Sequence, residues 1–147
     1  MPSDNPLKHF GLALLIALVL YFVAYAWIEH GRRRNGPWQV TFTNQPAGTA
    51  AIVINEHRIG ITNVKLQFSS TGLLTNSSDD LIFAQPRPVP YAVPYGKCVF
   101  MDTTFLPGTL TLQLFGHEIE LLPRVLVIDR KEYPWQSNTN IALRALK

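Results

Sequence analysis

The sequence predicts a mainly β protein, in which one N-terminal transmembrane helix precedes an antiparallel β-sandwich that contains a duplicated β-hairpin. Three observations lead to this prediction. An apolar run carries no charged side chain, apolar and polar residues alternate after it, and a hairpin pattern recurs at an offset of 60 residues. The expected divisions are a short polar tail at 1–9, the helix at 10–28, a basic juxtamembrane linker at 29–37 and the sandwich at 38–147.

The apolar run FGLALLIALVLYFVAYAWI, residues 10–28, has the length of a bilayer span. As a helix it would extend about 28 Å, which matches the hydrocarbon thickness of a bilayer. Tyr21, Tyr25 and Trp27 gather toward its end, where aromatic side chains favour the headgroup region. A retained anchor is the preferred interpretation. A cleaved signal peptide is the alternative, because Ala24 and Ala26 form a small-x-small pattern suited to cleavage after Ala26.

Basic residues beside the run predict the side of the membrane. Lys8 precedes it, and Arg32, Arg33 and Arg34 follow it. The excess on the C-terminal side favours a cytoplasmic location for the domain, with export of the domain as the alternative. We also expect the three arginines to contact lipid headgroups.

Alternation with a period of two begins after a turn at Asn35, Gly36 and Pro37. We expect about eight antiparallel strands, each bounded by Gly, Pro, Asn or Asp. Residues 141–146 fit either a last strand or a helical turn. The alternating runs start at Trp38, Ile52, Ile59, Val64, Cys98, Leu110, Ile119 and Val125.

An internal repeat relates residues 48–61 to residues 108–121, and Gly, Thr, His and Ile recur in place. The repeat halves cover about 38–68 and 98–128. We predict a pseudo-symmetric sandwich in which each half contributes one hairpin.

Each predicted hairpin has a two-residue turn, at Asn55-Glu56 in the first and at Phe115-Gly116 in the second. Residues that face each other across the turn then share one apolar face of the sheet. The expected pairs are Ile54 with His57, Ile52 with Ile59 and Ala50 with Ile61, and in the second hairpin Leu114 with His117, Leu112 with Ile119 and Leu110 with Leu121.

Residues 69–97 connect the two halves and change character midway. The early part is rich in Ser and Asn, and Asp79-Asp80 is expected there as a solvated loop. The later part favours polyproline II, as a stiff connection or as a docking segment for an aromatic groove. The interaction candidates are Pro86, Pro88, Pro90, Tyr91 and Trp135. Trp135 is expected in the core, and an exposed Trp135 would instead favour glycan binding.

Candidate catalytic residues are few. His57 and His117 are weak metal-ligand candidates, because no His-x-x-x-His spacing supports them and each is expected to bond a turn carbonyl. The lone Cys98 reads as a small buried residue of a strand, and a thiol nucleophile acting with a histidine and Asp102 is the alternative. No cofactor-binding motif is present in the sequence.

Charge excludes one class of function. The chain carries +3 overall, but residues 35–147 contain nine basic and eight acidic side chains, so the predicted domain lacks the basic surface of a nucleic-acid-binding protein. We therefore expect a non-enzymatic scaffold or protein-interaction module beside the bilayer, with lipid and another protein as partners. The alternatives are a membrane-tethered metal or thiol hydrolase using His57, His117 and Cys98, and a glycan-binding module.

Overall fold

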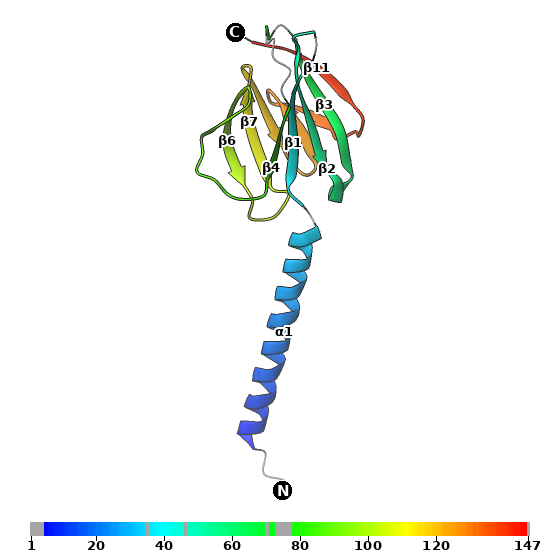
Figure 1. Ribbon diagram of the computed structural model, residues 1–147. Helices are drawn as coiled ribbons and strands as arrows, with labels where there is room; N and C mark the ends of the chain where they lie inside the picture. The colour runs from blue at the N-terminus through cyan, green and yellow to red at the C-terminus, as the bar shows by residue number, and fades with distance from the viewer. Residues whose placement is uncertain (1–4, 35, 46, 70, 73–77, 147) are drawn as a thin grey trace. The chain divides into compact units, whose positions relative to one another are not determined.

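The computed structural model describes residues 5–34, 36–45, 47–69, 71–72 and 78–146 (Figure 1). The chain divides into two compact units, Met1–Arg34 and Asn35–Lys147. The first unit contains one helix and the second contains two β-sheets.

Helix α1 covers Pro6–Arg34 and extends beyond the apolar run at both ends. Pro6 suits the first helical position, and the side chain of Asn5 accepts a hydrogen bond from the N–H of Leu7 at 3.3 Å. The polar residues at either end continue the helix because their helix propensities are ordinary. The segment Pro6–His30 contains an 18-residue stretch with a mean hydropathy of 2.4 and is long and apolar enough to cross a membrane, a criterion that an N-terminal signal sequence also meets.

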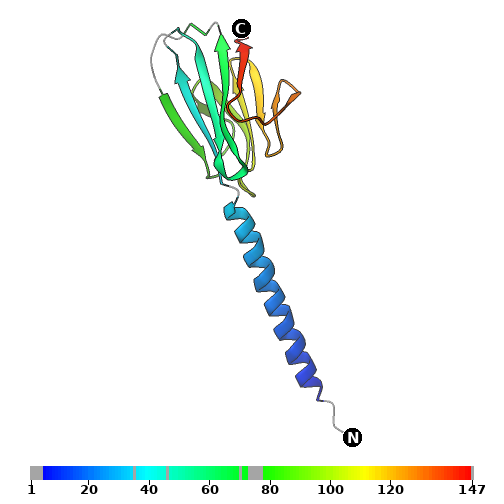
Figure 2. The same cartoon turned by 90° about the vertical axis from the view of Figure 1, so that its right-hand side faces the viewer.

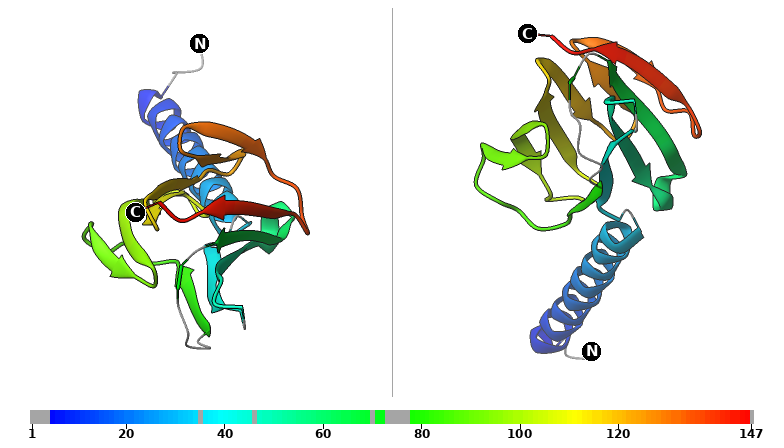
Figure 3. Two further views of the ribbon diagram at one scale, coloured as in Figure 1. Left: turned by 90° about the horizontal axis from the view of Figure 1, so that it is seen from above. Right: turned by 45° about the horizontal axis from the view of Figure 1, so that its top comes forward.

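The second unit is a β-sandwich, as predicted, and its two layers are seen end-on in Figure 3 (left). The first sheet has the strand order β11-β3-β2-β1-β4, and the second has the order β10-β9-β8-β7-β6-β5. The first sheet is formed by β1 (Trp38–Asn44), β2 (Ala50–Glu56), β3 (Ile61–Ser69), β4 (Ser78–Phe83) and β11 (Asn140–Arg144). The second is formed by β5 (Tyr91–Val93), β6 (Gly96–Asp102), β7 (Thr109–Leu114), β8 (His117–Leu121), β9 (Val125–Ile128) and β10 (Lys131–Pro134).

The core lies between the sheets and is built from alternate residues of the central strands. Trp38, Val40 and Phe42 of β1 are at most 1% exposed, and so are Leu110, Leu112 and Leu114 of β7. Burying such side chains contributes about 1.5–3 kcal/mol each, which explains why the alternation in the sequence predicts these two central strands.

The described residues form eleven strands rather than about eight. Strand β11 (Asn140–Arg144) settles the choice left open for residues 141–146 in favour of a strand, and residues 145 and 146 follow it without regular secondary structure. Figure 2 shows β11 in red beside the strands of the first sheet. It pairs with β3 in parallel, so that Ile141 lies opposite Leu66 and Leu143 opposite Phe68. Parallel pairing is possible because the chain arrives from β10 of the other sheet rather than through a hairpin.

The second predicted hairpin is confirmed. Leu114 pairs with His117, Leu112 with Ile119 and Leu110 with Leu121. Its turn places Phe115 at φ 50° and Gly116 at φ 85°. Positive φ at both positions gives the turn type that matches the twist of an antiparallel pair, and glycine adopts it without strain.

The first predicted hairpin is wrong in register. Ile54 pairs with Val64 rather than with His57, Ile52 pairs with Leu66 and Ala50 with Phe68. Asn55 and Glu56 stay in β2, and a 3₁₀ turn, η1 (His57–Ile59), follows them.

The turn chemistry explains this difference. Asn55-Glu56 offers no glycine for a two-residue turn, whereas Gly60 takes φ 81° at the end of η1. A Glu56 side-chain oxygen accepts a hydrogen bond from the N–H of Arg58 at 3.0 Å and caps η1. The structural duplication at an offset of 60 residues therefore stays unconfirmed, and His57 and His117 occupy different environments.

Asp79 and Asp80 are exposed, as predicted, but the prediction that they lie in a loop is wrong. Both residues lie in β4, an edge strand in which Asp80 pairs with Thr41 of β1. Leu81 and Phe83 alternate along β4 and pack against the core. The strand continues toward the N-terminus and includes the two exposed aspartates. Residues 73–77, part of the predicted loop region, lie outside the described residues.

Candidate functional site

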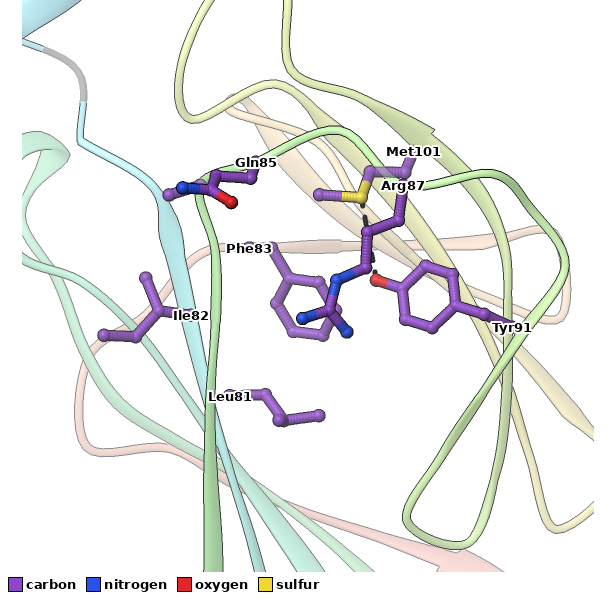
Figure 4. A pocket seen from close by; sticks show the side chains of 8 residues that line it. Leu81, Ile82, Phe83, Gln85, Arg87, Tyr91 and Met101 are labelled. Carbon is purple, nitrogen blue, oxygen red and sulfur yellow. Dashed lines mark hydrogen bonds between the residues drawn. The ribbon is translucent and has the colours of Figure 1, made fainter.

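A slot with a mixed polar and apolar lining opens between the two sheets where β4 and β5 form their neighbouring edges (Figure 4). Its volume is about 220 Å³. One wall comes from β4 and the residues that follow it, and the other comes from β5 and β6. The residues that line it are Leu81, Ile82, Phe83, Ala84, Gln85, Arg87, Tyr91 and Met101.

The β4 wall follows from strand alternation. Figure 4 shows the side chains of Leu81 and Phe83 on one side of β4 and that of Ile82 on the other. Phe83 is 4% exposed, whereas Ile82 is 62% exposed. The strand therefore presents an apolar inner side to the slot and an apolar side chain to solvent.

The opposite wall depends on a β-bulge in β6, where the register with β7 shifts between Cys98 and Phe100. One extra residue changes the alternation, so that both Cys98 and Met101 face inward. Phe100 pairs with Thr111 and is 50% exposed. Without the bulge, Met101 would lie on the outer face and the slot would lose this wall.

Tyr91 supplies the polar contacts of the slot. Its hydroxyl donates a hydrogen bond to Sδ of Met101 at 3.6 Å, drawn as a dashed line in Figure 4. The Arg87 guanidinium carbon lies 5.6 Å from the centre of the Tyr91 ring, within the range of a cation–π contact. Burial and the neighbouring Cys98 raise the pKa of Tyr91 to about 12, so the phenol is neutral at pH 7. The slot thus combines apolar side chains with a phenol, an amide and one cation.

The proline-rich connection runs beside the slot, between β4 of the first sheet and β5 of the second. Pro86, Pro88 and Pro90 are exposed. Tyr91, by contrast, packs against the core and fixes the end of the connection. Of the predicted interaction residues, the structure brings Tyr91 into the slot and places the three prolines next to it in the chain.

Trp135 lies apart from the slot. Its ring is 5.3 Å from the ring of Trp38, and its indole N–H donates to the carbonyl oxygen of Leu122 at 2.7 Å. The side chain is partly buried against the core. This agrees with the expectation that Trp135 packs against the core.

Cys98 is buried, as expected from its strand. Its thiol donates to the carbonyl oxygen of Phe100 at 3.4 Å, and burial raises the pKa of the thiol. Asp102 lies at the exposed end of β6, where its carboxylate accepts the N–H of Thr104 at 2.9 Å. In the described part of the chain, Cys98 forms no hydrogen bond with His57, His117 or Asp102, so a nucleophile, a base and a carboxylate are not assembled.

His117 forms a compact polar cluster that the sequence did not indicate. Nδ1 lies 2.6 Å from Oδ2 of Asp129, and Nε2 lies 2.7 Å from the carbonyl oxygen of Arg144. The other carboxylate oxygen of Asp129 accepts the N–H of Glu118 at 3.0 Å. His117 is 6% exposed, whereas His57 is exposed on η1.

Opposing effects determine the pKa values of this pair. Burial alone would lower the pKa of His117, but the hydrogen bonds to Asp129 and to the Arg144 carbonyl outweigh it and raise the pKa above 6.5. Burial would raise the pKa of Asp129, but hydrogen bonds from His117 and from the Glu118 N–H outweigh it and lower the pKa below 3.8. The charged forms of both groups are therefore favoured.

Glu56 is a buried acid that the sequence analysis also missed. It is 2% exposed, and its Oε2 has no hydrogen-bond partner among the described residues. Burial raises the pKa of the carboxyl group, against the hydrogen bond from Arg58. Alternate residues of β2 face the core, as Ile52 and Ile54 do, and Glu56 is the next in this series. A buried acid therefore occupies a position where a hydrophobic residue is usual.

Two predicted sites involve other parts of the chain. No group of three or more His, Cys, Asp or Glu is placed to hold a metal ion within the described residues. The predicted headgroup contacts of Arg32, Arg33 and Arg34 lie outside the described side chains, although their backbone belongs to α1.

Comparisons of the chain with protein-family models, with curated proteins and with solved structures found no match.

Proposed function

We propose that the chain is a single-pass, membrane-anchored β-sandwich that acts without catalysis, as a module that binds another protein beside the bilayer. The observation that supports this most directly is the slot between β4 and β5, which has an exposed proline-rich segment next to it. Its mixture of apolar side chains, hydrogen-bonding groups and one arginine suits recognition of another chain, because it supplies contact area and directional polar contacts.

The size of the slot favours a protein partner. Its volume of about 220 Å³ accommodates one or two side chains, whereas sites for small molecules typically enclose about 300–1,000 Å³. One wall is the edge strand β4, whose second edge pairs with no other described strand. An unpaired edge offers backbone donors and acceptors to an extended segment, while the slot takes a side chain from it.

The anchor part of the proposal rests on α1. We infer that the helix is retained rather than removed as a signal sequence, and that Arg32, Arg33 and Arg34 lie at the lipid headgroups. By the same charge asymmetry, the sandwich would lie in the cytoplasm. Few residues separate α1 from β1, so the domain would meet its partner close to the membrane.

Site-specific photo-crosslinking of the full chain in its native membrane tests the proposed site. A photoreactive amino acid in place of Gln85 would stand at the slot, since Gln85 is exposed and lines it. The matched control is Gln136, which is exposed on the connection between β10 and β11 at the opposite edges of the sheets. We expect one discrete crosslinked product from position 85 and none of the same mass from position 136.

A second pair of variants tests whether the crosslinked product depends on the slot. Ala84→Trp would fill the mouth of the slot, and we expect it to reduce the crosslinked product about tenfold, equivalent to about 1.4 kcal/mol of binding. Ala92→Trp adds the same side chain at an exposed position of β5 outside the slot lining and should leave the yield unchanged. Equal yields in both variants, or no product from position 85, would refute the assignment of the slot.

A further inference from the structure

The hydrogen bonds of His117 require a particular protonation state. Both of its ring nitrogens face oxygen atoms, a carboxylate oxygen of Asp129 at 2.6 Å and the backbone carbonyl oxygen of Arg144 at 2.7 Å. A carbonyl and an ionised carboxylate only accept hydrogen bonds. Both ring nitrogens must therefore carry protons, and a neutral imidazole, with one N–H, would leave one oxygen facing a lone pair.

The carbonyl that His117 binds belongs to the C-terminal strand. β11 is an edge strand that pairs only with β3 among the described strands. Two backbone hydrogen bonds follow the His117 contact, from Ala145 N–H to the Ser69 carbonyl at 3.1 Å and from Leu146 N–H to the Phe115 carbonyl at 2.9 Å. The His117 and Leu146 contacts join the end of β11, which belongs to the first sheet, to the β7–β8 hairpin of the second.

Asp129 determines the charge balance around the ring. It is the titratable side chain bonded to His117, from the turn between β9 and β10. On β8 itself, Glu118 contributes its backbone N–H to Asp129. The His117 ring faces Phe68 of β3, with 6.2 Å between the ring centres. On the side of β11 it contacts the carbonyl oxygen of Arg144, a residue that is exposed.

We propose that His117 and Asp129 form a protonation-controlled latch, which fastens the C-terminal strand β11 to the sandwich while the histidine is charged and releases its end when the proton is lost. Release of this end would uncover the edge of β3 near Ser69 without disturbing the other strands, because β11 pairs with no described strand except β3. This device is independent of the slot at β4, which lies at the other end of the first sheet.

The direction of the pH dependence follows from the hydrogen bonds. They raise the pKa of folded His117 above 6.5, so the latch is complete below that pH and is lost as pH rises through the folded-state pKa. Asp129 contributes to the latch in its ionised form. Because its pKa in the folded protein is lowered, this contribution is complete above pH 3.8 and is lost as the pH falls through the lowered pKa. The strand is therefore held most firmly in mildly acidic solution.

Amide hydrogen exchange of the full chain in lipid nanodiscs tests the latch. NMR would follow the Ala145 and Leu146 amides from about pH 6 to about pH 9, spanning the usual range of histidine titration. We expect their protection, corrected for intrinsic exchange, to fall about tenfold as His117 titrates, the effect of losing one hydrogen bond to a charged group. The amide of Leu112 in the central strand β7 should keep its protection.

Two variants and a control complete the test. His117→Gln should give low protection of the Ala145 and Leu146 amides at every pH, whereas His57→Gln, at an exposed histidine, should behave as the natural chain. If His117→Gln fails to fold, Asp129→Asn serves instead, and its transition should move to lower pH. The proposal is overturned if the natural chain shows pH-independent protection at these amides, if the amide of Leu112 loses protection together with them, or if Asp129→Asn leaves the transition unmoved.

Discussion

At the scale of single residues, the environment decides what each reactive side chain can do. Cys98 is the only cysteine and the natural candidate for thiol chemistry. The strand buries it completely, and the raised pKa of its thiol disfavours the thiolate, which is the nucleophilic form. His117 is engaged at both ring nitrogens, so it has no free nitrogen to act as a general base.

Thiol labelling measures this protection directly. In the folded full chain we expect Cys98 to react with a soluble maleimide at a rate on the order of 100-fold lower than a fully exposed cysteine, since reaction requires local opening. Phe105→Cys provides the exposed reference in the same molecule, because residue 105 is 66% exposed. Comparable rates at the two positions would instead indicate an accessible thiol and would revive the hydrolase alternative.

At the scale of elements, the two hairpins show that turn residues control strand register. Similar apolar patterns flank both turns, yet Phe115-Gly116 closes a tight hairpin and Asn55-Glu56 does not. The difference is the glycine, which allows positive φ directly after the strand. In the first hairpin the chain continues through η1 until Gly60 provides the same backbone conformation.

Two glycine substitutions separate backbone strain from packing. Gly60→Ala should destabilise the sandwich by about 1–2 kcal/mol, the cost of a left-handed conformation for a residue with a Cβ, because nothing lies within 4 Å of the added atom. Gly116→Ala incurs the same strain and also places its Cβ 2.8 Å from the Cβ of Leu146. We expect it to cost at least about 1 kcal/mol more.

Thermal unfolding of both glycine variants, in the same detergent as the natural chain, gives the comparison. Equal losses of stability would show that the C-terminal residues yield to the added methyl group without cost. A larger loss for Gly116→Ala would show that the tail beyond β11 packs firmly on the β7–β8 turn.

At the scale of the whole molecule, α1 and the sandwich are separate compact units of different composition. The apolar stretch of the helix has apolar side chains on all sides, and none of its residues is buried. Such a surface suits contact with lipid. The sandwich buries most of its apolar residues between its two sheets, and its side chains carry almost no net charge. The side of the membrane on which it lies decides which partners it meets.

Reporter fusions at the C-terminus test that orientation. The positive-inside rule predicts activity from a reporter that works only in the cytoplasm and none from one that works only outside. Replacing Arg32, Arg33 and Arg34 by Asn should weaken or reverse this preference, whereas the same change at Arg124, Arg130 and Lys131 of the sandwich should not. The mass of the natural protein shows whether the chain is cleaved after Ala26, a result that would contradict a retained anchor.

Local pattern alone determined the apolar helix, the strands with buried alternate residues and the tight turn at Phe115-Gly116. Hydropathy and backbone preference act over a few neighbouring residues, so they are readable along the chain. Only the tertiary structure decided the slot, the parallel position of β11 and the contacts of His117, whose partners lie 12 and 27 residues away in the sequence. Such contacts depend on how distant strands pack side by side, and no spacing within one segment encodes that packing.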